Sequence, residues 1–289
     1  MTTQENEAKI MSMYEAKLAT WPVPYEEGYV KTRYGTTHVI MSGPKEAPPL
    51  VLVHAMGVTS TMWLPNIAAL SREYRVYAVD TIGDFGKSAL DNLDRYPRNG
   101  REYSLWLTDV FDQLSIQKAD IIGASMGGWI TMNYAIYAPD RVNRIALLGP
   151  LGIRSSFQVL FRLMSVVLFP VQANKRSLIQ WTLGDNPRAR DAYTEYMLTA
   201  VNCRNRLGTP YAISGDNLRR IKAPVLLVLG GSDNPIGSAE KAAARAEKLI
   251  PDIQVEIMPK TGHLMNMEDP EFVNAAILKF LYQSAHGNS

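Results

Sequence analysis

Residues 119–128 read ADIIGASMGG, a short apolar run that leads into a Gly-x-Ser-x-Gly turn. The run Ala119–Ile122 predicts a buried strand, and the apolar stretch Gly128–Tyr137 behind the turn predicts a helix. A sharp strand-to-helix turn lifts its serine above the sheet edge in strained geometry, and small neighbours avoid a backbone clash. The same turn places Ser125 at a helix N-terminus, where the helix dipole favours a developing anion. We therefore predict that Ser125 is a catalytic nucleophile.

A serine hydroxyl is a poor nucleophile and needs a base, for which the chain offers four histidines. His38 falls within an early predicted strand, His54 ends another strand, and His286 lies three residues from the C-terminus. His263 follows directly after the last predicted strand, where a loop can reach back over the sheet edge. Position and elimination together predict that His263 is the base.

The carboxylate that orients this base is expected after a strand between the serine and the histidine. The loop GGSD at 230–233 follows an apolar run and offers Asp233. The competing location, residues 149–157 after the preceding strand, contains no carboxylate. Glu268 and Asp269 follow the histidine too closely, and Asp269 precedes a proline, which suits the start of a helix. We predict that Asp233 is the acid.

A tetrahedral intermediate also needs hydrogen-bond donors for its oxyanion. The residue after the nucleophile, Met126, offers one backbone N–H. The loop His54-Ala55-Met56-Gly57 follows another predicted strand and is expected to supply the second donor from Met56. Because this role needs only backbone atoms, the two methionine side chains remain available to line a pocket.

Apolar runs and helical patterns alternate along most of the chain. Continuous apolar runs, typical of strands covered on both faces, occur at Leu50–His54, Tyr77–Asp80, Ala119–Ile122, Arg144–Leu148 and Val225–Leu229. Helical patterns occur between and after them, at Trp63–Leu70, Tyr103–Leu114, Gly128–Tyr137 and Ala239–Leu249. This alternation predicts an α/β protein with right-handed βαβ units and a doubly wound, mostly parallel sheet.

The two ends of the chain extend this pattern. A helix is predicted at Glu5–Ala19, followed by two alternating strands that the turn residue Gly35 separates. Near the other end, Ile253–Ile257 alternates as a half-buried edge strand. A last helix is predicted to begin at Pro270 behind an Asp269 cap.

The alternation stops between residues 151 and 215. Helical stretches follow one another there, at Phe157–Phe169, Ser177–Leu183 and Pro187–Cys203. The first stretch is apolar nearly all round and needs cover on every side. We predict a core of residues 1–150 and 216–289, with residues 151–215 inserted as a helical cap. Its apolar side chains suggest that the cap roofs an acyl or aromatic pocket, and they are Phe157, Leu160, Phe161, Met164, Val167 and Trp181.

Composition excludes several functional classes. The 289 residues are 46% hydrophobic and 20% charged, and 30 basic residues against 28 acidic ones leave a net charge of +2. With no dense basic run, the chain is not expected to bind nucleic acid. One cysteine and four histidines leave little for a metal site, so neither metal nor cofactor is predicted. The polar N-terminus and the lack of a long apolar stretch predict a cytoplasmic protein without a membrane span.

On these residues the chain resembles an α/β-hydrolase of the carboxylesterase kind. Ser125, Asp233 and His263 follow the chain order of that family's triad. Similar stretches in naproxen-type bacterial carboxylesterases match TRYGTTHVIMSG (32–43), STMWLPNIAAL (60–70) and YRVYAVDTIGDFGKS (74–88), and residues 80–88 fit the family's D-x-x-G-x-x-G-x-S loop. The resemblance implies an α/β-hydrolase fold with an inserted cap and cofactor-free ester hydrolysis. The sequence departs from the family at Ala55, where the family usually has a glycine. If that glycine serves a positive φ, Ala55 would shift the loop and with it the proposed donor, the backbone N–H of Met56.

The leading functional expectation is a serine carboxylesterase that acts on short-to-medium or aryl esters through an acyl-enzyme. The same triad also serves C–C bond hydrolases, perhydrolases and thioesterases, and the sequence does not separate these reactions. A hypothesis of another class is a ligand receptor with residual hydrolase activity. The expected partner is a small-molecule ester, and the sequence leaves a homodimer open.

Overall fold

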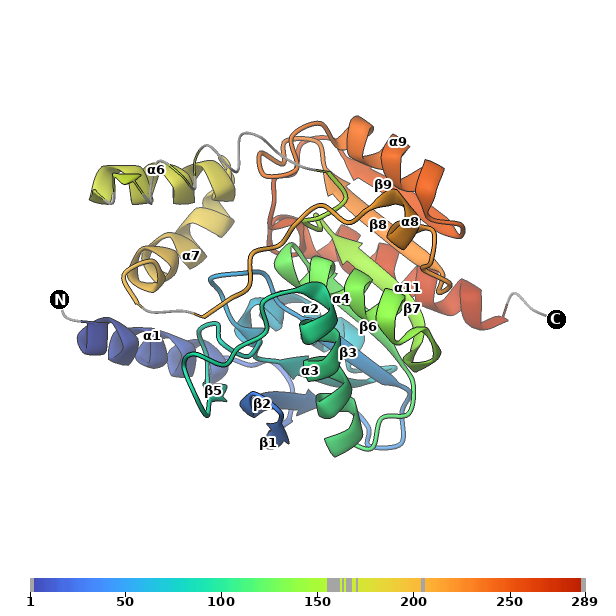
Figure 1. Cartoon of the computed structure of the whole chain (residues 1–289), viewed down its shortest axis with the longest axis horizontal. Coiled ribbons are helices and arrows are strands. Elements are labelled where there is room, and N and C mark those ends of the chain that lie inside the picture. The colour runs from blue at the N-terminus through green and yellow to red at the C-terminus, as the bar shows by residue number, and fades with distance from the viewer. Residues whose placement is uncertain are drawn as a thin grey trace.

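The computed structural model describes residues 3–154, 162, 164, 168–169, 171–203 and 206–286. In this part of the chain a nine-stranded sheet runs through the middle of the molecule in the order β1-β2-β4-β3-β6-β7-β8-β9, with β5 paired to β2 (Figure 1). The strands are β1 (Tyr25–Thr32), β2 (Gly35–Ser42), β3 (Pro49–Val53), β4 (Arg75–Val79), β5 (Ala89–Leu90), β6 (Ala119–Ala124), β7 (Val142–Leu148), β8 (Val225–Gly230) and β9 (Ile253–Met258). From β4 across to β9 the pairs are parallel, whereas β1, β2 and β5 pair antiparallel. The predicted fold class is confirmed.

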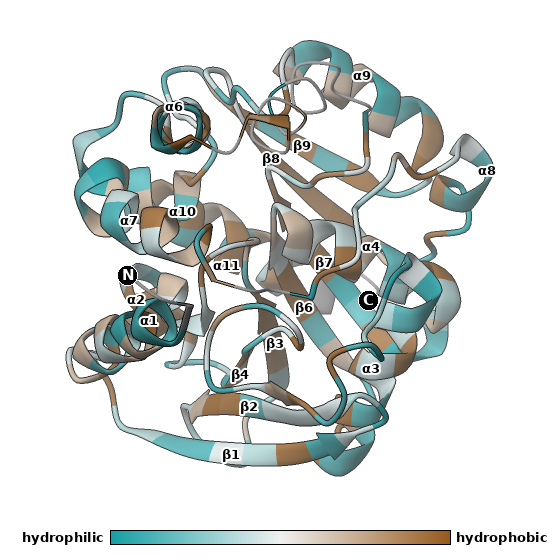
Figure 2. Ribbon diagram, turned by 60° about the vertical axis from the view of Figure 1, so that its left-hand side comes forward, coloured by the Kyte–Doolittle hydropathy of each residue, from teal (hydrophilic) through white to brown (hydrophobic). Residues whose placement is uncertain are grey.

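Helices cover both faces of the sheet because successive strand side chains point to opposite sides. Val51 and Val53 of β3 join the core beneath α3 (Gly100–Gln113), α4 (Met126–Tyr137), α8 (Gly215–Leu218) and α9 (Ala239–Leu249). Leu50 and Leu52 face the other core, beneath α1 (Thr3–Leu18), α2 (Leu64–Leu70), α10 (Met265–Glu268) and α11 (Pro270–His286). In Figure 2 the central strands are coloured mainly hydrophobic and the edge strand β1 mostly hydrophilic, as expected for strands covered on two faces and on one.

Two local predictions need correction. Gly35 is not the turn between β1 and β2: Thr32 pairs with Gly35, so residues 33–34 make the turn and Gly35 begins β2. The helix predicted at Trp63–Leu70 begins instead with a 3₁₀ turn, η1 (Ser60–Trp63), and becomes α-helical at Leu64. Pro65 near the start of α2 suits this boundary because proline is tolerated in the first turn of a helix. A second 3₁₀ turn, η2 (Pro139–Arg141), leads into β7.

The segment between β7 and β8 contains the helices α6 (Gln172–Leu183) and α7 (Pro187–Ala200), which pack against each other at one end of the molecule (Figure 1). Both helices were predicted, with slightly different ends. Helix α7 also contacts the N-terminal helix α1, where Lys9 pairs with Glu195 and Lys17 Nζ lies 3.8 Å from the ring centroid of Tyr193. The helix predicted at Phe157–Phe169 falls largely outside the described residues, as do the predicted pocket residues Phe157, Leu160, Phe161 and Val167.

Candidate active site

Ser125 occupies a sharp turn between β6 and α4. Its backbone has φ 51° and ψ −112°, a strained conformation for a residue with a side chain. The two motif glycines are required by close packing. A Cβ on Gly127 would lie 2.1 Å from the carbonyl oxygen of Val53 at the end of β3, and one on Gly123 would lie 2.5 Å from the carbonyl oxygen of Gly127. The turn therefore holds Ser125 at the carboxyl edge of the sheet.

Three side chains from separate strand ends meet at that edge. His263 follows β9, Asp233 follows β8, and both are buried together with Ser125. The Nδ1 atom of His263 lies 3.0 and 2.9 Å from the two carboxylate oxygens of Asp233, and its Nε2 atom lies 2.8 Å from Ser125 Oγ. A carboxylate only accepts hydrogen bonds, so Nδ1 carries the hydrogen and Nε2 of the neutral ring accepts from the serine hydroxyl. This arrangement can take a proton from Ser125.

The loop after β7 makes room for the acid. Gly149 has φ +49°, and a Cβ there would lie 2.8 Å from Asp233 Oδ2 and 3.3 Å from His263 Nδ1. The carboxylate also accepts a hydrogen bond of 3.0 Å from the backbone N–H of Ile236. Residues 149–157 lack a carboxylate, which is one sequence signal in favour of Asp233. A glycine at this position is a second signal, because the space against the acid excludes any side chain.

Neither acidic residue close to His263 in sequence competes with Asp233. Glu268 accepts a 2.9 Å hydrogen bond from the backbone N–H of Gly262, and burial raises its pKa. Asp269 accepts from the backbone N–H of Phe272 at 3.0 Å and so caps α11, as predicted. The Glu268 contact holds the loop that carries His263, a role that the sequence analysis missed.

His54, directly after β3, has a structural environment. Its Nδ1–H donates to Ala55 O at 2.7 Å, and its Nε2 accepts from the backbone N–H of Thr81 at 2.9 Å. Burial lowers the pKa of this imidazole. His54 is thus neutral and fully paired, and it ties the loop after β3 to the loop after β4.

The loop after β3 resolves the question raised by Ala55. Among the described non-glycine residues, only Ser115 and Ser125 have a positive φ. Ala55 does not, so the backbone at position 55 does not require a glycine. The left-handed conformation falls two residues later, at Gly57 with φ +76°. No hydrogen bond from the backbone N–H of Met56 or Met126 to a described atom is observed, and Met126 is the first residue of α4. With no partner among the described residues, both N–H groups can bind an anion.

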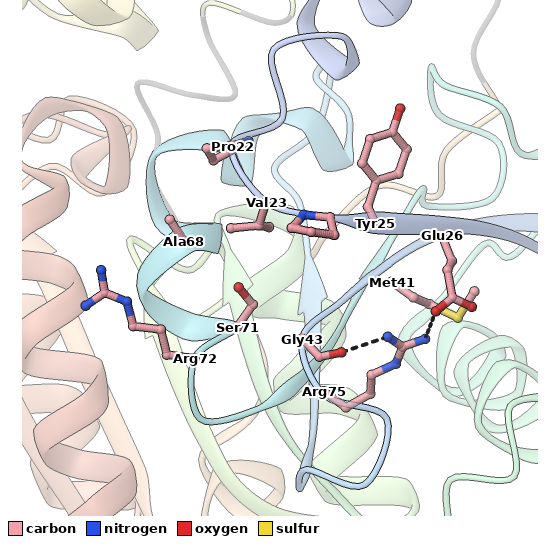
Figure 3. Close-up of a pocket in the computed structure, with 11 residues that line it drawn as sticks. Pro22, Val23, Tyr25, Glu26, Met41, Gly43, Ala68, Ser71, Arg72 and Arg75 are labelled. Carbon is pink, nitrogen blue, oxygen red and sulfur yellow. Dashed lines mark hydrogen bonds and ion pairs between the residues drawn. The ribbon is translucent and has the colours of Figure 1, made fainter.

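A separate pocket of about 540 Å³ lies at the opposite edge of the sheet and contains none of these residues (Figure 3). Arg75, at the start of β4, crosses it and donates to Gly43 O at 2.9 Å and to Glu26 at 3.2 Å. Among the described residues no cluster of three or more His, Cys, Asp or Glu side chains could bind a metal ion. No helix in the described ranges is both long and apolar enough to span a bilayer.

The fold and this strand-edge geometry define an alpha/beta hydrolase, and comparison with known proteins agrees. Residues 50–276 match the alpha/beta hydrolase family, and the chain belongs to it. A relative named "Uncharacterized carboxylesterase nap", from Bacillus subtilis (strain 168), is 36% identical over 284 residues, which cover 96% of this chain and 93% of the relative.

Two solved structures from Bacillus subtilis are also similar along almost the whole chain. Carboxylesterase CesB (YbfK) has a TM-score of 0.88 and 34% identity, and the match covers 96% of this chain and 98% of that one. Naproxen esterase (carboxylesterase NP) has a TM-score of 0.86 and 35% identity, with the same coverage. The resemblance to naproxen-type carboxylesterases found in the sequence is confirmed.

Proposed function

We propose that this protein is a serine carboxylesterase in which Ser125 is the nucleophile, His263 the base and Asp233 the acid. The observation that carries the proposal is the unbroken line of hydrogen bonds from the Asp233 carboxylate through His263 to Ser125 Oγ. The names of its nearly full-length relatives, which are carboxylesterases, agree with this activity.

The proposed reaction has two halves. Ser125 Oγ attacks the ester carbonyl while His263 Nε2 accepts its proton and then returns it to the leaving alcohol, which gives an acyl-enzyme. A water molecule, deprotonated by the same nitrogen, releases the acid and restores Ser125. Asp233 keeps the hydrogen of the imidazole on Nδ1 and stabilises the positive charge that the ring acquires.

The proposed oxyanion donors are the backbone N–H groups of Met56 and Met126. They come from the loop after β3 and from the first residue of α4, and the α4 dipole adds a favourable field for negative charge. The support for this assignment is that neither group has an acceptor among the described residues, while Ala55 does not need a positive φ.

The proposed substrates are short-to-medium or aryl carboxylic esters. Helices α6 and α7 belong to the segment 151–215, which we propose as the cap over the site, on a core of residues 1–150 and 216–289. The predicted pocket residue Trp181 lies in α6. One relative is named naproxen esterase, after an aryl-substituted acid, in line with the aryl preference. A cytoplasmic location remains a prediction of the sequence, and a homodimer remains open.

The test is turnover of p-nitrophenyl esters of increasing acyl length by the wild type and by Ser125→Ala. We expect rapid multiple turnover by the wild type and a loss of at least about 10⁴-fold in kcat in the variant, because the nucleophile is gone. Unchanged far-ultraviolet circular dichroism would show that the variant is folded. Full activity in the folded variant would refute the assignment. Faster cleavage of a ring-cleavage product or a thioester, or faster formation of peracetic acid and water from acetic acid and hydrogen peroxide, would replace ester hydrolysis with one of the same-triad reactions. Tight ester binding with negligible kcat would indicate a receptor.

A further inference from the structure

The loop that carries Met56 is held by a carboxylate from another loop. The backbone N–H of Gly57 donates to Asp84 Oδ2 at 3.0 Å. Asp84 belongs to the loop after β4, and its other oxygen accepts from the backbone N–H of Phe85 at 2.9 Å. One side chain therefore bridges the loop after β3 and the loop after β4, next to the peptide that links Met56 to Gly57.

The backbone on both sides of this bridge is unusual. Gly57 has φ +76° and Gly83, just before Asp84, has φ +83°. A Cβ on Gly83 would lie 2.3 Å from the carbonyl oxygen of Arg206, whose own N–H donates to Gly83 O at 2.8 Å. Met197 of α7 lies near the bridge, because its Cε is 3.9 Å from the position that a Cβ on Gly57 would take. The bridge therefore lies between the sheet edge and α7, and Asp84 is half-buried there.

No cation compensates the Asp84 carboxylate among the described residues. Asp80, in the same loop, adds a second negative charge. Burial and the negative charge of Asp84 both raise the pKa values of Tyr103 in α3 and Tyr196 in α7, so both phenols belong to the electrostatic surroundings of Asp84. Arg206, whose backbone contacts Gly83, directs its guanidinium to Leu93 O at 3.1 Å. Burial raises the pKa of Asp84 to about 7, although the N–H groups of Gly57 and Phe85 oppose the shift.

We propose that Asp84 is a positioning residue of the oxyanion loop, which holds the Met56–Gly57 peptide by its hydrogen bond to Gly57 and tunes turnover by its own charge. The inference rests on the proposed esterase function. When Asp84 is protonated, its carbonyl oxygen still accepts from Gly57 and the loop is held without a charge. When Asp84 ionises, it puts a negative charge beside the place where the oxyanion develops, and the transition state is destabilised.

The experiment is the dependence of kcat and KM on pH for p-nitrophenyl acetate, measured for the wild type, Asp84→Asn and Asp84→Ala. The wild type is expected to lose activity above about pH 7, by about tenfold, as Asp84 ionises. Asparagine keeps the acceptor for Gly57 but has no charge, so Asp84→Asn should retain the neutral-pH kcat and lose the alkaline fall. Alanine removes the acceptor, so kcat should drop about tenfold or more at every pH while KM changes little.

Asp91→Asn is the matched control. Asp91 is an exposed carboxylate close in sequence that pairs with Lys31 at 2.7 Å, and its removal should leave the pH profile unchanged. Labelling of Ser125 by a fluorophosphonate checks that each variant is folded with a competent nucleophile. If the wild type turns over and Asp84→Asn keeps the alkaline fall, the role of Asp84 is wrong while the esterase function stands. If the wild type cleaves no ester at all, the proposed function fails, and this inference with it.

Discussion

The described part of the chain contains two buried histidine–aspartate pairs that share one contact. In each pair Nδ1 of the imidazole lies 2.9 Å from an aspartate oxygen, between His263 and Asp233 in one and between His38 and Asp80 in the other. All four side chains are almost completely buried. The pairs differ in what meets the second ring nitrogen.

The second nitrogen of His38 lies 2.9 Å from the carboxylate of Glu27. Burial opposes ionisation of Asp80, but the hydrogen bond and charge of His38 lower its pKa below the usual range. Burial likewise opposes ionisation of Glu27, but hydrogen bonds and charges of Lys87 and His38 lower its pKa as well. Because both carboxylates only accept, both nitrogens of His38 must donate. Such a ring has no lone pair to receive a proton, whereas Nε2 of His263 faces a hydroxyl that can donate one. The chemistry of each pair is thus decided by the third group.

The pair around Asp80 connects the scaffold. Asp80 Oδ1 accepts from the hydroxyl of Ser60 at 2.7 Å and from its backbone N–H at 3.0 Å. Its other oxygen accepts from the phenol of Tyr14 at 3.0 Å and from the backbone N–H of Lys87 at 3.1 Å. The carboxylate therefore joins α1, η1 and the loop after β4.

The comparison is tested most sharply by the same substitution in each pair. Asp233→Asn should lower kcat by about 10⁴-fold, because asparagine favours the wrong tautomer of His263, and should change stability little. Asp80→Asn should leave kcat of the folded protein within a few fold. The measurements are kcat for p-nitrophenyl acetate and urea unfolding of both variants. Equal losses of kcat in the two folded variants would show that the third group does not distinguish the pairs.

Asp80→Asn should instead lower the free energy of unfolding by about 3 kcal/mol at neutral pH, because it breaks a buried network of charges. The pKa of Asp80 is lower in the folded than in the unfolded protein, so its stabilisation is fully present above the unfolded pKa. The stabilisation is lost as pH falls through the folded value. The difference between wild type and variant should therefore be full at pH 7 and shrink below about pH 4. A difference in urea midpoints that does not change with pH would contradict this origin.

Gly149→Ala should have the smallest of these effects, a loss in kcat of about 10- to 100-fold, because its Cβ would displace Asp233 from His263. Gly184→Ala is a matched control, since Gly184 also has a positive φ, +65°, but nothing lies within 4 Å of its Cβ. Both variants should lose about 1 kcal/mol or more of stability from backbone strain. A similar kcat in the two variants would mean that the Asp233 side chain can shift away from a Cβ at position 149 without a loss of activity.

The pair His263–Asp233, which lies next to Ser125, could be predicted from the sequence, but the pair His38–Asp80 could not. Gly-x-Ser-x-Gly after an apolar run is a local signal, and elimination among four histidines led from Ser125 to His263 and then to Asp233. His38 was placed only as a residue within a strand. Its partners Asp80 and Glu27 stand on other elements, and no local pattern relates them. Asp84 and Gly149 were missed for the same reason: their importance lies in contacts between loops distant in sequence.

The alternation of apolar runs and helical patterns was enough to determine the α/β fold and its mostly parallel sheet, because burial on two faces requires such patterns over a few neighbouring residues. The chain order of Ser125, Asp233 and His263 likewise follows from local motifs at strand ends. Only the tertiary structure decided which histidine presents a ring nitrogen that can accept a proton from Ser125. It also decided why Ala55 is tolerated and where the carboxyl group of Asp84 is held. These properties depend on distances of about 3 Å between groups that folding brings together, and linear sequence does not encode such distances locally.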